Sequence, residues 1–399
     1  MSDFDIGQLP GQSFFCRVII GGHEISPANI ISLTIREWVL DILPRIEIVF
    51  GDLGTFLETY PFEDGAEINV TLAKQKDSKD ALSMDFYLSD YSVAVKLDNK
   101  QYELTVVGIM KADNMFTIKT KSFGKKTSED VFKVIAKEAG ITFSNPNSVI
   151  PSDKMTWYQL NQCNYDFIKH ILKRSFVPND CIFFYASSNK KFTYTTLNKE
   201  IDKKTVRIAK YNIEQTEARD NPDKDKTLYY NAYDIVNMSG RYNKESNYGL
   251  QVKYYDLQSP KTIVYNSSKS LTKLTFKNKN YAGRPVYSMQ GGLYNNLNVY
   301  SEKYFESLIR NIYLVNNFFA YSVVIQADPD EKVELFDKID LVLPSILTEE
   351  MNGVISGEYL IGGIIHNVQY GSVYKKLISL HRNGMNESPY NKQPIVSKS

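Results

Sequence analysis

This 399-residue sequence has few cysteines, almost no net charge and no long apolar run. The three cysteines (Cys16, Cys163 and Cys181) are odd in number and widely spaced, so we expect packing thiols in a reducing cytoplasm rather than disulfides or a zinc site. The 47 basic and 46 acidic side chains nearly cancel, which gives no sign of nucleic-acid or membrane binding. No apolar run reaches the roughly 18 residues of a membrane span, and the acidic N-terminus is unlike a signal peptide. We therefore expect no stable membrane association.

Motifs for catalysis and nucleotide binding are also missing. The stretch from Gly124 to Thr127 looks like the end of a phosphate loop, but Lys119 stands where such a loop needs glycine. Ser356 lacks the glycine two residues before it that a nucleophile elbow requires. No metal-binding spacing occurs among the four histidines, which are His23, His170, His366 and His381. We predict no catalytic, cofactor or metal site, although two carboxylates that converge in space, as in a glycosidase, remain possible.

Aromatic residues are abundant, with 28 Tyr and 21 Phe against 2 Trp. Tyr and Phe favour half-buried, pleated surfaces, so this composition predicts a β-rich chain with extensive interfaces. Several tyrosines cluster between residues 229 and 265. They indicate core and interface packing, and the alternative is a platform on which sugars or bases stack. The chain length predicts two to four domains.

The first 112 residues show a succession of short alternating segments with turn signals between them. Gly21 and Gly22 mark one turn, and residues 98–100 mark another. The pattern predicts an antiparallel barrel or sandwich in residues 1–112. The predicted strands are residues 14–20, 30–39, 45–50, 67–73, 84–95 and 101–109.

Residues 113–200 have a different pattern, which predicts a small α+β insertion. A helix is expected at 128–139, with Thr127 or Ser128 as its cap and Gly140 at its end. A second helix is expected to begin with Asn164 as its cap. A hairpin of residues 181–185 and 191–196 completes the region.

Residues 201–385 return to strands and predict a second barrel similar to the first, joined by connecting strands. The tail at 386–399 is polar and is expected to be mobile. The predicted fold class is thus mainly β, with two similar β-barrel domains and a small α+β domain. The C-terminal elements are a helix at 301–317 and strands at 318–325, 336–343, 357–361, 364–370 and 374–380.

Three segments resemble a known family in the same order along the chain. Residues 127–141 resemble its "late control" helix, residues 157–168 resemble the entry to its second helix, and residues 357–367 resemble its C-terminal strand pair. The family is the baseplate hub proteins of contractile tails. It includes the hub of T4-like myophages, late control protein D, and the N-terminal part of type VI secretion spike proteins. This sequence departs from the family pattern in having Lys338 and Ile339 before Asp340, where a glycine often stands.

The resemblance implies a structural protein of the virion tail baseplate, assembled in the host cytoplasm, with no enzyme activity and no cofactor. Its tail-tube-like barrels would come in pairs, so a homotrimer would form a pseudo-sixfold ring. That ring would join a sixfold tail tube, or its initiator, to a threefold central spike and to other baseplate proteins. DNA would only pass through the lumen, which we expect to be neutral to acidic. Spike and lysozyme activities are not expected.

Two other functions remain open on the sequence. The first is a cell-wall hydrolase at the tail tip, which would need a convergent carboxylate pair in a cleft. The second is a glycan-binding receptor module, which would need solvent-facing tyrosines in a groove. The sequence does not identify individual interface residues.

Overall fold

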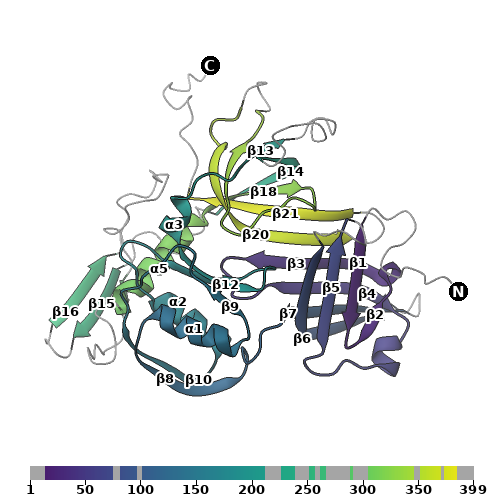
Figure 1. Cartoon of the computed structure of the whole chain (residues 1–399), viewed down its shortest axis with the longest axis horizontal. Helices are drawn as coiled ribbons and strands as arrows, with labels where there is room; N and C mark the ends of the chain where they lie inside the picture. Colours follow the sequence, from purple (N-terminus) through teal and green to yellow (C-terminus); the bar gives the residue numbers. More distant parts are fainter. Residues whose placement is uncertain are drawn as a thin grey trace, which may run out of the picture.

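The computed structural model describes ten stretches of the chain: residues 14–74, 81–96, 101–211, 226–238, 251–256, 261–266, 288–290, 304–345, 351–369 and 373–383. These form a mainly β protein in which one large sheet runs through both halves of the molecule (Figure 1). The predicted turn at 98–100 and the tail at 386–399 lie outside the described residues.

Seven antiparallel strands from the N-terminal third follow the spatial order β3-β4-β7-β6-β5-β1-β2. Gly21 and Gly22 make the predicted β1–β2 turn, with φ of 57° and 84°, a backbone region that glycine enters without steric cost. All six predicted strands are confirmed within two residues at each end. The elements are β1 (Phe15–Ile20), β2 (His23–Ile25), η1 (Pro27–Asn29), β3 (Ile30–Trp38), β4 (Arg45–Asp52), η2 (Thr55–Thr59), β5 (Glu67–Ala73), β6 (Leu82–Lys96) and β7 (Gln101–Met110).

The insertion contains both predicted helices and the predicted hairpin. Thr127 caps the first helix through a reciprocal capping box: its hydroxyl accepts from the Asp130 backbone N–H, and the Asp130 carboxylate accepts from the Thr127 N–H. Gly140 follows the helix with φ of 68°, as predicted. The elements are β8 (Ile118–Lys126), α1 (Ser128–Glu138), β9 (Thr142–Ser144), β10 (Met155–Cys163), α2 (Asn164–Arg174), β11 (Ile182–Ala186), β12 (Lys191–Thr196) and α3 (Leu197–Ile201).

Two features of the insertion differ from the prediction. Cys163 rather than Asn164 occupies the N-cap position of α2, and it makes no side-chain capping hydrogen bond. The Asn164 side chain is buried and bonds instead to Gln159 and Glu138. The paired strands β8 and β10 were not predicted. The exposed residues of β8 are mostly small or polar, so the apolar alternation that marks a strand is absent from it.

The C-terminal half contains a closed six-stranded barrel. Its strands follow the order β19-β13-β14-β18-β21-β20, and the β19–β20 pairing closes the ring. The elements are β13 (Arg207–Tyr211), β14 (Thr227–Asn237), α5 (Tyr304–Phe318), β18 (Tyr321–Ala327), β19 (Lys338–Val342), β20 (Gly357–Gln369) and β21 (Val373–Arg382). A separate small sheet is made of β15 (Gln251–Asp256), β16 (Lys261–Asn266) and β17 (Ser288–Gln290).

Two boundaries in this half were predicted incorrectly. The segments 357–361 and 364–370 are one continuous strand, β20, because Gly362 and Gly363 continue the ladder through a bulge. The strand expected from residue 318 begins at Tyr321, because Phe318 still belongs to α5.

The entry to β19 takes a turn that the sequence pattern left in doubt. Phe336 has φ of 66°, a left-handed conformation that is costly for a bulky side chain. Its ring is buried and packs edge-to-face against Phe183 and Tyr185, at centroid distances of 5.0 and 5.7 Å. Aromatic packing therefore holds Phe336 in this left-handed turn, two residues before β19 begins.

Strand β20 joins the two halves because it pairs with β21 inside the barrel and with β3 of the first sheet. The ring of Trp38 lies directly over Gly363, so that a Cβ atom there would sit 2.0 Å from Trp38 Cε3. Trp38 also packs edge-to-face on His381, with a centroid distance of 5.1 Å. The seam between the halves is therefore a close-packed ladder rather than a linker.

Strand β11 ties the insertion to both halves. Ile182, Phe184 and Ala186 belong to the core beneath the first sheet. The alternate residues Cys181, Phe183 and Tyr185 belong to the core of the barrel. Because successive side chains of a strand point to opposite faces, one buried strand serves two cores. The insertion thus packs as part of the whole molecule.

Substituting Gly363 tests this seam. We expect Gly363→Ala to lower the free energy of unfolding by about 1–3 kcal/mol or more, because the new methyl group overlaps the Trp38 ring. Gly353→Ala is the control, since nothing lies within 4 Å of its Cβ position. Urea unfolding of the two variants measures the difference. Equal midpoints would show that the seam is not closely packed.

The buried His381 predicts a dependence of stability on pH. Burial lowers its pKa from 6.5 to about 3, so its stabilising contribution is complete above pH 6.5 and is lost as the pH falls towards 3. The wild-type unfolding free energy should therefore fall more steeply with acidification than that of His381→Gln, by up to about 1.4 kcal/mol per pH unit. His23→Gln serves as the control. Parallel pH curves for wild type and His381→Gln would contradict this.

Candidate assembly surfaces

Two buried carboxylates, Asp153 and Asp180, act as structural anchors. Asp153 accepts hydrogen bonds from the backbone N–H groups of Ser128 and Phe176, at 2.9 and 3.0 Å. Asp180 does the same for Cys181 and Asn198. Burial raises the pKa of both groups despite these hydrogen bonds. Each carboxylate uses its oxygens to fix local backbone, which is a role in the fold.

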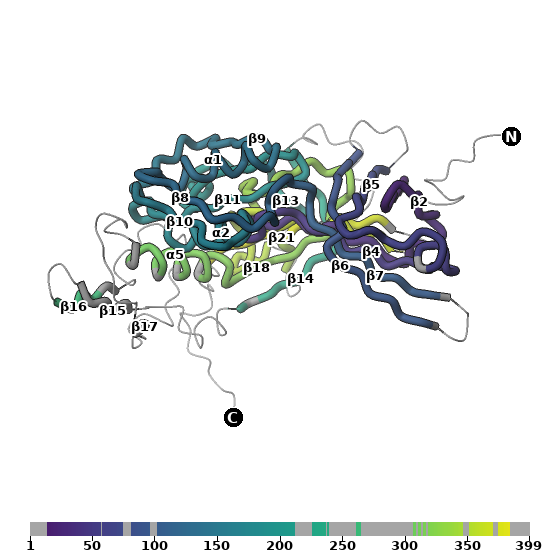
Figure 2. The backbone as a smooth tube through the Cα atoms, turned by 90° about the horizontal axis from the view of Figure 1, so that it is seen from below, coloured from purple at the N-terminus to yellow at the C-terminus, as the bar shows by residue number. Residues whose placement is uncertain are grey.

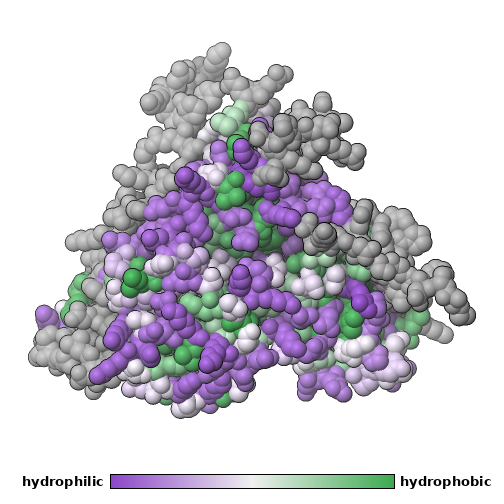
Figure 3. Space-filling model, viewed as in Figure 1, coloured by the Kyte–Doolittle hydropathy of each residue, from purple (hydrophilic) through white to green (hydrophobic). Residues whose placement is uncertain are grey.

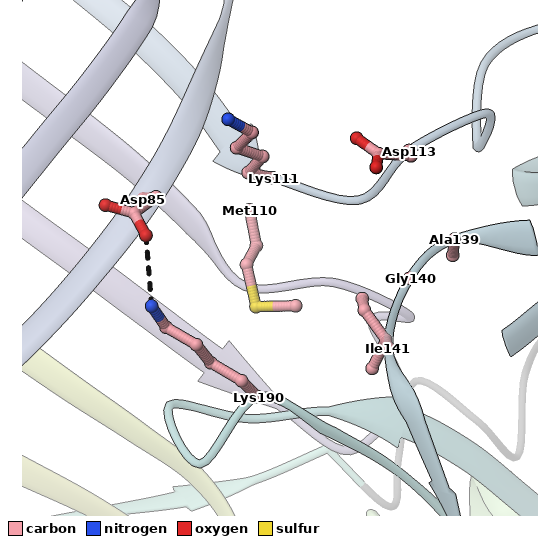
Figure 4. A pocket seen from close by; sticks show the side chains of 8 residues that line it. All are labelled: Asp85, Met110, Lys111, Asp113, Ala139, Gly140, Ile141 and Lys190. Atoms are coloured by element: carbon pink, nitrogen blue, oxygen red, sulfur yellow. Dashed lines mark hydrogen bonds and ion pairs between the residues drawn. The ribbon is translucent and has the colours of Figure 1, made fainter. Parts of the chain in front are cut away.

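A cavity of about 200 Å³ lies between the first sheet and the end of α1, and two carboxylates line it (Figure 4). Asp85 forms an ion pair with Lys190 at 3.0 Å and accepts a hydrogen bond from Asn69. Burial alone would raise the pKa of Asp85, but those contacts lower it on balance. Asp113, across the cavity, accepts a hydrogen bond from Tyr87. A hydrolase needs a carboxyl group whose pKa is raised, and Asp85 has the opposite shift.

The cysteines and His366, which were expected to pack rather than to form a site, are buried or partly buried. Cys16 and Cys181 are buried, Cys163 is partly buried, and all three are free thiols. His366 is buried and packs as expected, with its Nδ1 atom 2.7 Å from the Tyr374 hydroxyl. Within the described stretches, no group of three or more His, Cys, Asp or Glu residues could hold a metal ion. No helix in those stretches is long and apolar enough to cross a membrane.

The tyrosines that suggested a stacking platform do not share one environment. Tyr229 and Tyr233 of β14 are half-buried, and Tyr254, Tyr255 and Tyr265 lie on β15 and β16. Tyr230 is 1% exposed and donates a hydrogen bond to the Val342 carbonyl. It packs on Tyr211 and Tyr233, with centroid distances of 5.6 and 6.2 Å. Tyr242 and Tyr248 lie outside the described residues. Packing within the barrel therefore accounts for Tyr230 and Tyr233.

Strand β6 extends well beyond its neighbour β5. The two strands pair only from Leu82 to Tyr87, whereas β7 follows β6 as far as Lys96. Residues 89–95 are exposed on both faces, including Tyr91, Val93 and Val95 at 46%, 37% and 59%. The far half of β6 is thus an apolar strand with one edge unpaired among the described residues.

Strand β14 of the barrel has the same property. It pairs with β13 only from Thr227 to Tyr230, while β18 follows it to Asn237. Beyond that point Ile235 and Val236 are each 42% exposed. The described part of the molecule therefore presents a second apolar strand edge.

These two edges leave the body on the same side of the molecule (Figure 2). Natural proteins protect an exposed strand edge with lysine, proline or a covering element. Residues 89–95 and 231–236 contain only one charged residue each, Asp90 and Asp234. The opposite broad face, by contrast, is covered largely by hydrophilic side chains in Figure 3. Unprotected β-branched edges are suited to pairing with another chain.

Sequence reasoning did not single out these residues. Their signal is weak, because Val93 and Val95 continue the alternation of a strand that is otherwise ordinary. Only the lengths of the neighbouring strands, β5 and β13, show where pairing stops. One signal could have indicated an exposed edge. Adjacent apolar residues near the end of a strand, such as Ile235 and Val236, place apolar side chains on both faces of the sheet.

Comparison with solved structures places the fold among phage tail proteins. The 43 kDa tail protein of prophage MuSo2 from Shewanella oneidensis superposes with a TM-score of 0.57 at 10% identity, over 94% of this chain and 100% of that one. A tail protein from Neisseria meningitidis MC58 gives a TM-score of 0.55 at 11% identity, over 94% and 98%. The chain thus has the fold of these tail proteins, as the resemblance in the sequence predicted.

At these identities the likeness concerns the fold. No protein-family model matches the sequence, and no curated protein matches it either. The chain is a mainly β protein with the fold of these tail proteins, and its described part has exposed strand edges suited to pairing with another chain.

Proposed function

We propose that this protein is the structural hub of a contractile-tail baseplate or a related injection system. In this role three chains form a pseudo-sixfold ring that joins a sixfold tail tube to a threefold central spike. The ring encloses a channel through which DNA or effectors pass, and the protein performs no catalysis. The observation that carries the proposal is the pair of unprotected apolar strand edges on a chain with the tail-protein fold.

The geometry of the edges supports a ring with doubled symmetry. Each chain presents two edges, β6 from the first sheet and β14 from the barrel, on one side of the molecule. Three chains present six edges, and identical subunits close into a ring through a fixed rotation. Strand addition supplies backbone hydrogen bonds, and burial of Val93, Val95, Ile235 and Val236 supplies apolar area. The edges thus provide contacts for both neighbours in a ring.

The solution mass of the purified protein, measured by light scattering on a sizing column, tests this proposal. We expect about three times the chain mass of 45.7 kDa. Val93→Lys and Ile235→Lys should each reduce the mass to that of one chain, because a charged lysine on an edge strand would have to be buried when another strand pairs with it. Val134→Lys on α1 is the control, since Val134 is 36% exposed against 37% for Val93.

Two results would contradict the proposal. The first is a single-chain mass for the wild type, both alone and after a spike protein is added. The second is a trimer that both edge variants leave intact, which would show that assembly uses other surfaces. In a trimer structure, a continuous ring of Lys and Arg around the channel would contradict the expected neutral or acidic lumen.

A further inference from the structure

The two-stranded sheet of β8 and β10 has a groove along one side. A cavity of about 190 Å³ is lined by six residues of β10 between Met155 and Gln162, and by His170 of α2. Because nearly every residue along this part of β10 contributes, the cavity follows the strand edge rather than one face. In the described sheet, β10 pairs with β8 alone. The groove therefore lies along an edge that an extended segment could pair with.

The surface beside this groove includes exposed apolar side chains. Ile118, Tyr158 and Leu160 are 65%, 41% and 62% exposed. The lysines at 119 and 121 are held by Glu138, at 2.8 and 2.7 Å. The exposed apolar side chains can therefore contact a partner directly.

The surroundings of the groove are strongly basic although the whole chain is nearly neutral. Residues 118–126 and 154–174 contain eight Lys or Arg residues and one acid, Asp166. Glu138, which pairs with Lys119 and Lys121, adds a second acid, so the formal excess is six positive charges. Burial lowers the pKa of His170, and the nearby Arg174 and Lys173 lower it further. The local potential around the groove is thus positive, and a negatively charged ligand would be attracted to it.

A protein segment suits this surface better than a nucleic acid. The Trp157 ring is 2% exposed, so among the lining residues only Tyr158 and the half-buried His170 offer a ring on which a base could stack. Binding of single strands uses several stacking rings in succession. The apolar lining next to an unpaired strand edge instead fits a side chain of an extended polypeptide.

We propose that the β10 groove binds an extended acidic segment of another protein, with an apolar side chain of that segment in the cavity beside Leu160. The segment lies along the outer edge of β10, and its carboxylates face Lys173 and the other basic residues around the groove. This groove is on β10 of the insertion, whereas the unpaired edges are on β6 and β14. The inference is therefore independent of ring formation and of the proposed hub role.

Fluorescence anisotropy with labelled synthetic peptides tests this proposal on the full-length chain. The probe is a ten-residue peptide in which valine alternates with glutamate around one central phenylalanine. The comparison probes are the same peptide with lysine in place of glutamate, and a single-stranded oligonucleotide of ten thymidines. We expect saturable binding of the acidic peptide that weakens as salt is added, with at least tenfold weaker binding of the lysine peptide.

Two variants test whether the peptide binds in the groove. Leu160→Glu should weaken binding of the acidic peptide at least tenfold, and Leu160 is exposed enough for the variant to fold. Lys173→Glu should weaken it by a smaller factor through charge alone. Leu53→Glu, at a position that is 82% exposed and belongs to the loop after β4, should leave it unchanged.

Several outcomes would overturn the proposal. The first is that the acidic peptide does not bind even at a 100-fold molar excess of protein over probe. The second is that wild type and Leu160→Glu bind the acidic peptide equally well. The third is that the wild type binds the lysine peptide as tightly as the acidic peptide. Tighter binding of the oligonucleotide than of the acidic peptide would assign the surface to nucleic acid instead. None of these results depends on the oligomeric state, so they are distinguishable from a failure of the hub proposal.

Discussion

The pairing of β20 with β3 is the interaction on which the rest of the structure depends. Seven residue pairs from Gly363 to Gln369 of β20 match Trp38 to Ser32 of β3. This ladder turns a seven-stranded sheet and a closed barrel into one continuous sheet of thirteen strands. The ladder also requires particular residues, because the Trp38 ring lies against the backbone at Gly363 and leaves no room for a side chain there.

The seam fixes where the exposed edges point. Strand β6 belongs to the first sheet and β14 to the barrel, so their relative placement is set by hydrogen bonds that cross β3 and β20. A flexible connection would let the two edges move independently and would prevent them from closing a regular ring. A buried ladder does not permit this motion, because opening it would leave its backbone N–H and C=O groups without hydrogen-bond partners.

Much of the fold was predictable from the sequence, because alternation of apolar residues reveals strands with one buried face. The strands of the first sheet, the capping box of α1 and the Gly140 helix end all follow such local rules. Strands β8 and β10 were missed because the β8 residues outside the core are mostly lysine, threonine and serine. The prediction of two separate strands in place of β20 was wrong because Gly362 and Gly363 resemble a turn in the sequence. In the structure these glycines make room for the side chains of His381 and Trp38.

The candidate site was less predictable than the fold. An assembly edge is defined by where a neighbouring strand stops, and that depends on pairing between distant segments rather than on local composition. Val93 and Ile235 are ordinary strand residues until the lengths of β5 and β13 are known. The groove along β10 needed the same information, although its excess of positive charge is visible in the sequence.

Native-state hydrogen exchange, followed residue by residue against added denaturant, tests the continuous sheet most directly. If the seam joins the halves into one body, the paired amides of β3 and β20 should open with the same free energy as those in β4 and β7. Their exchange would then require unfolding of the whole sheet. Amides of the β3–β20 ladder that exchange through a separate opening of lower free energy, while β4 and β7 stay protected, would contradict the account.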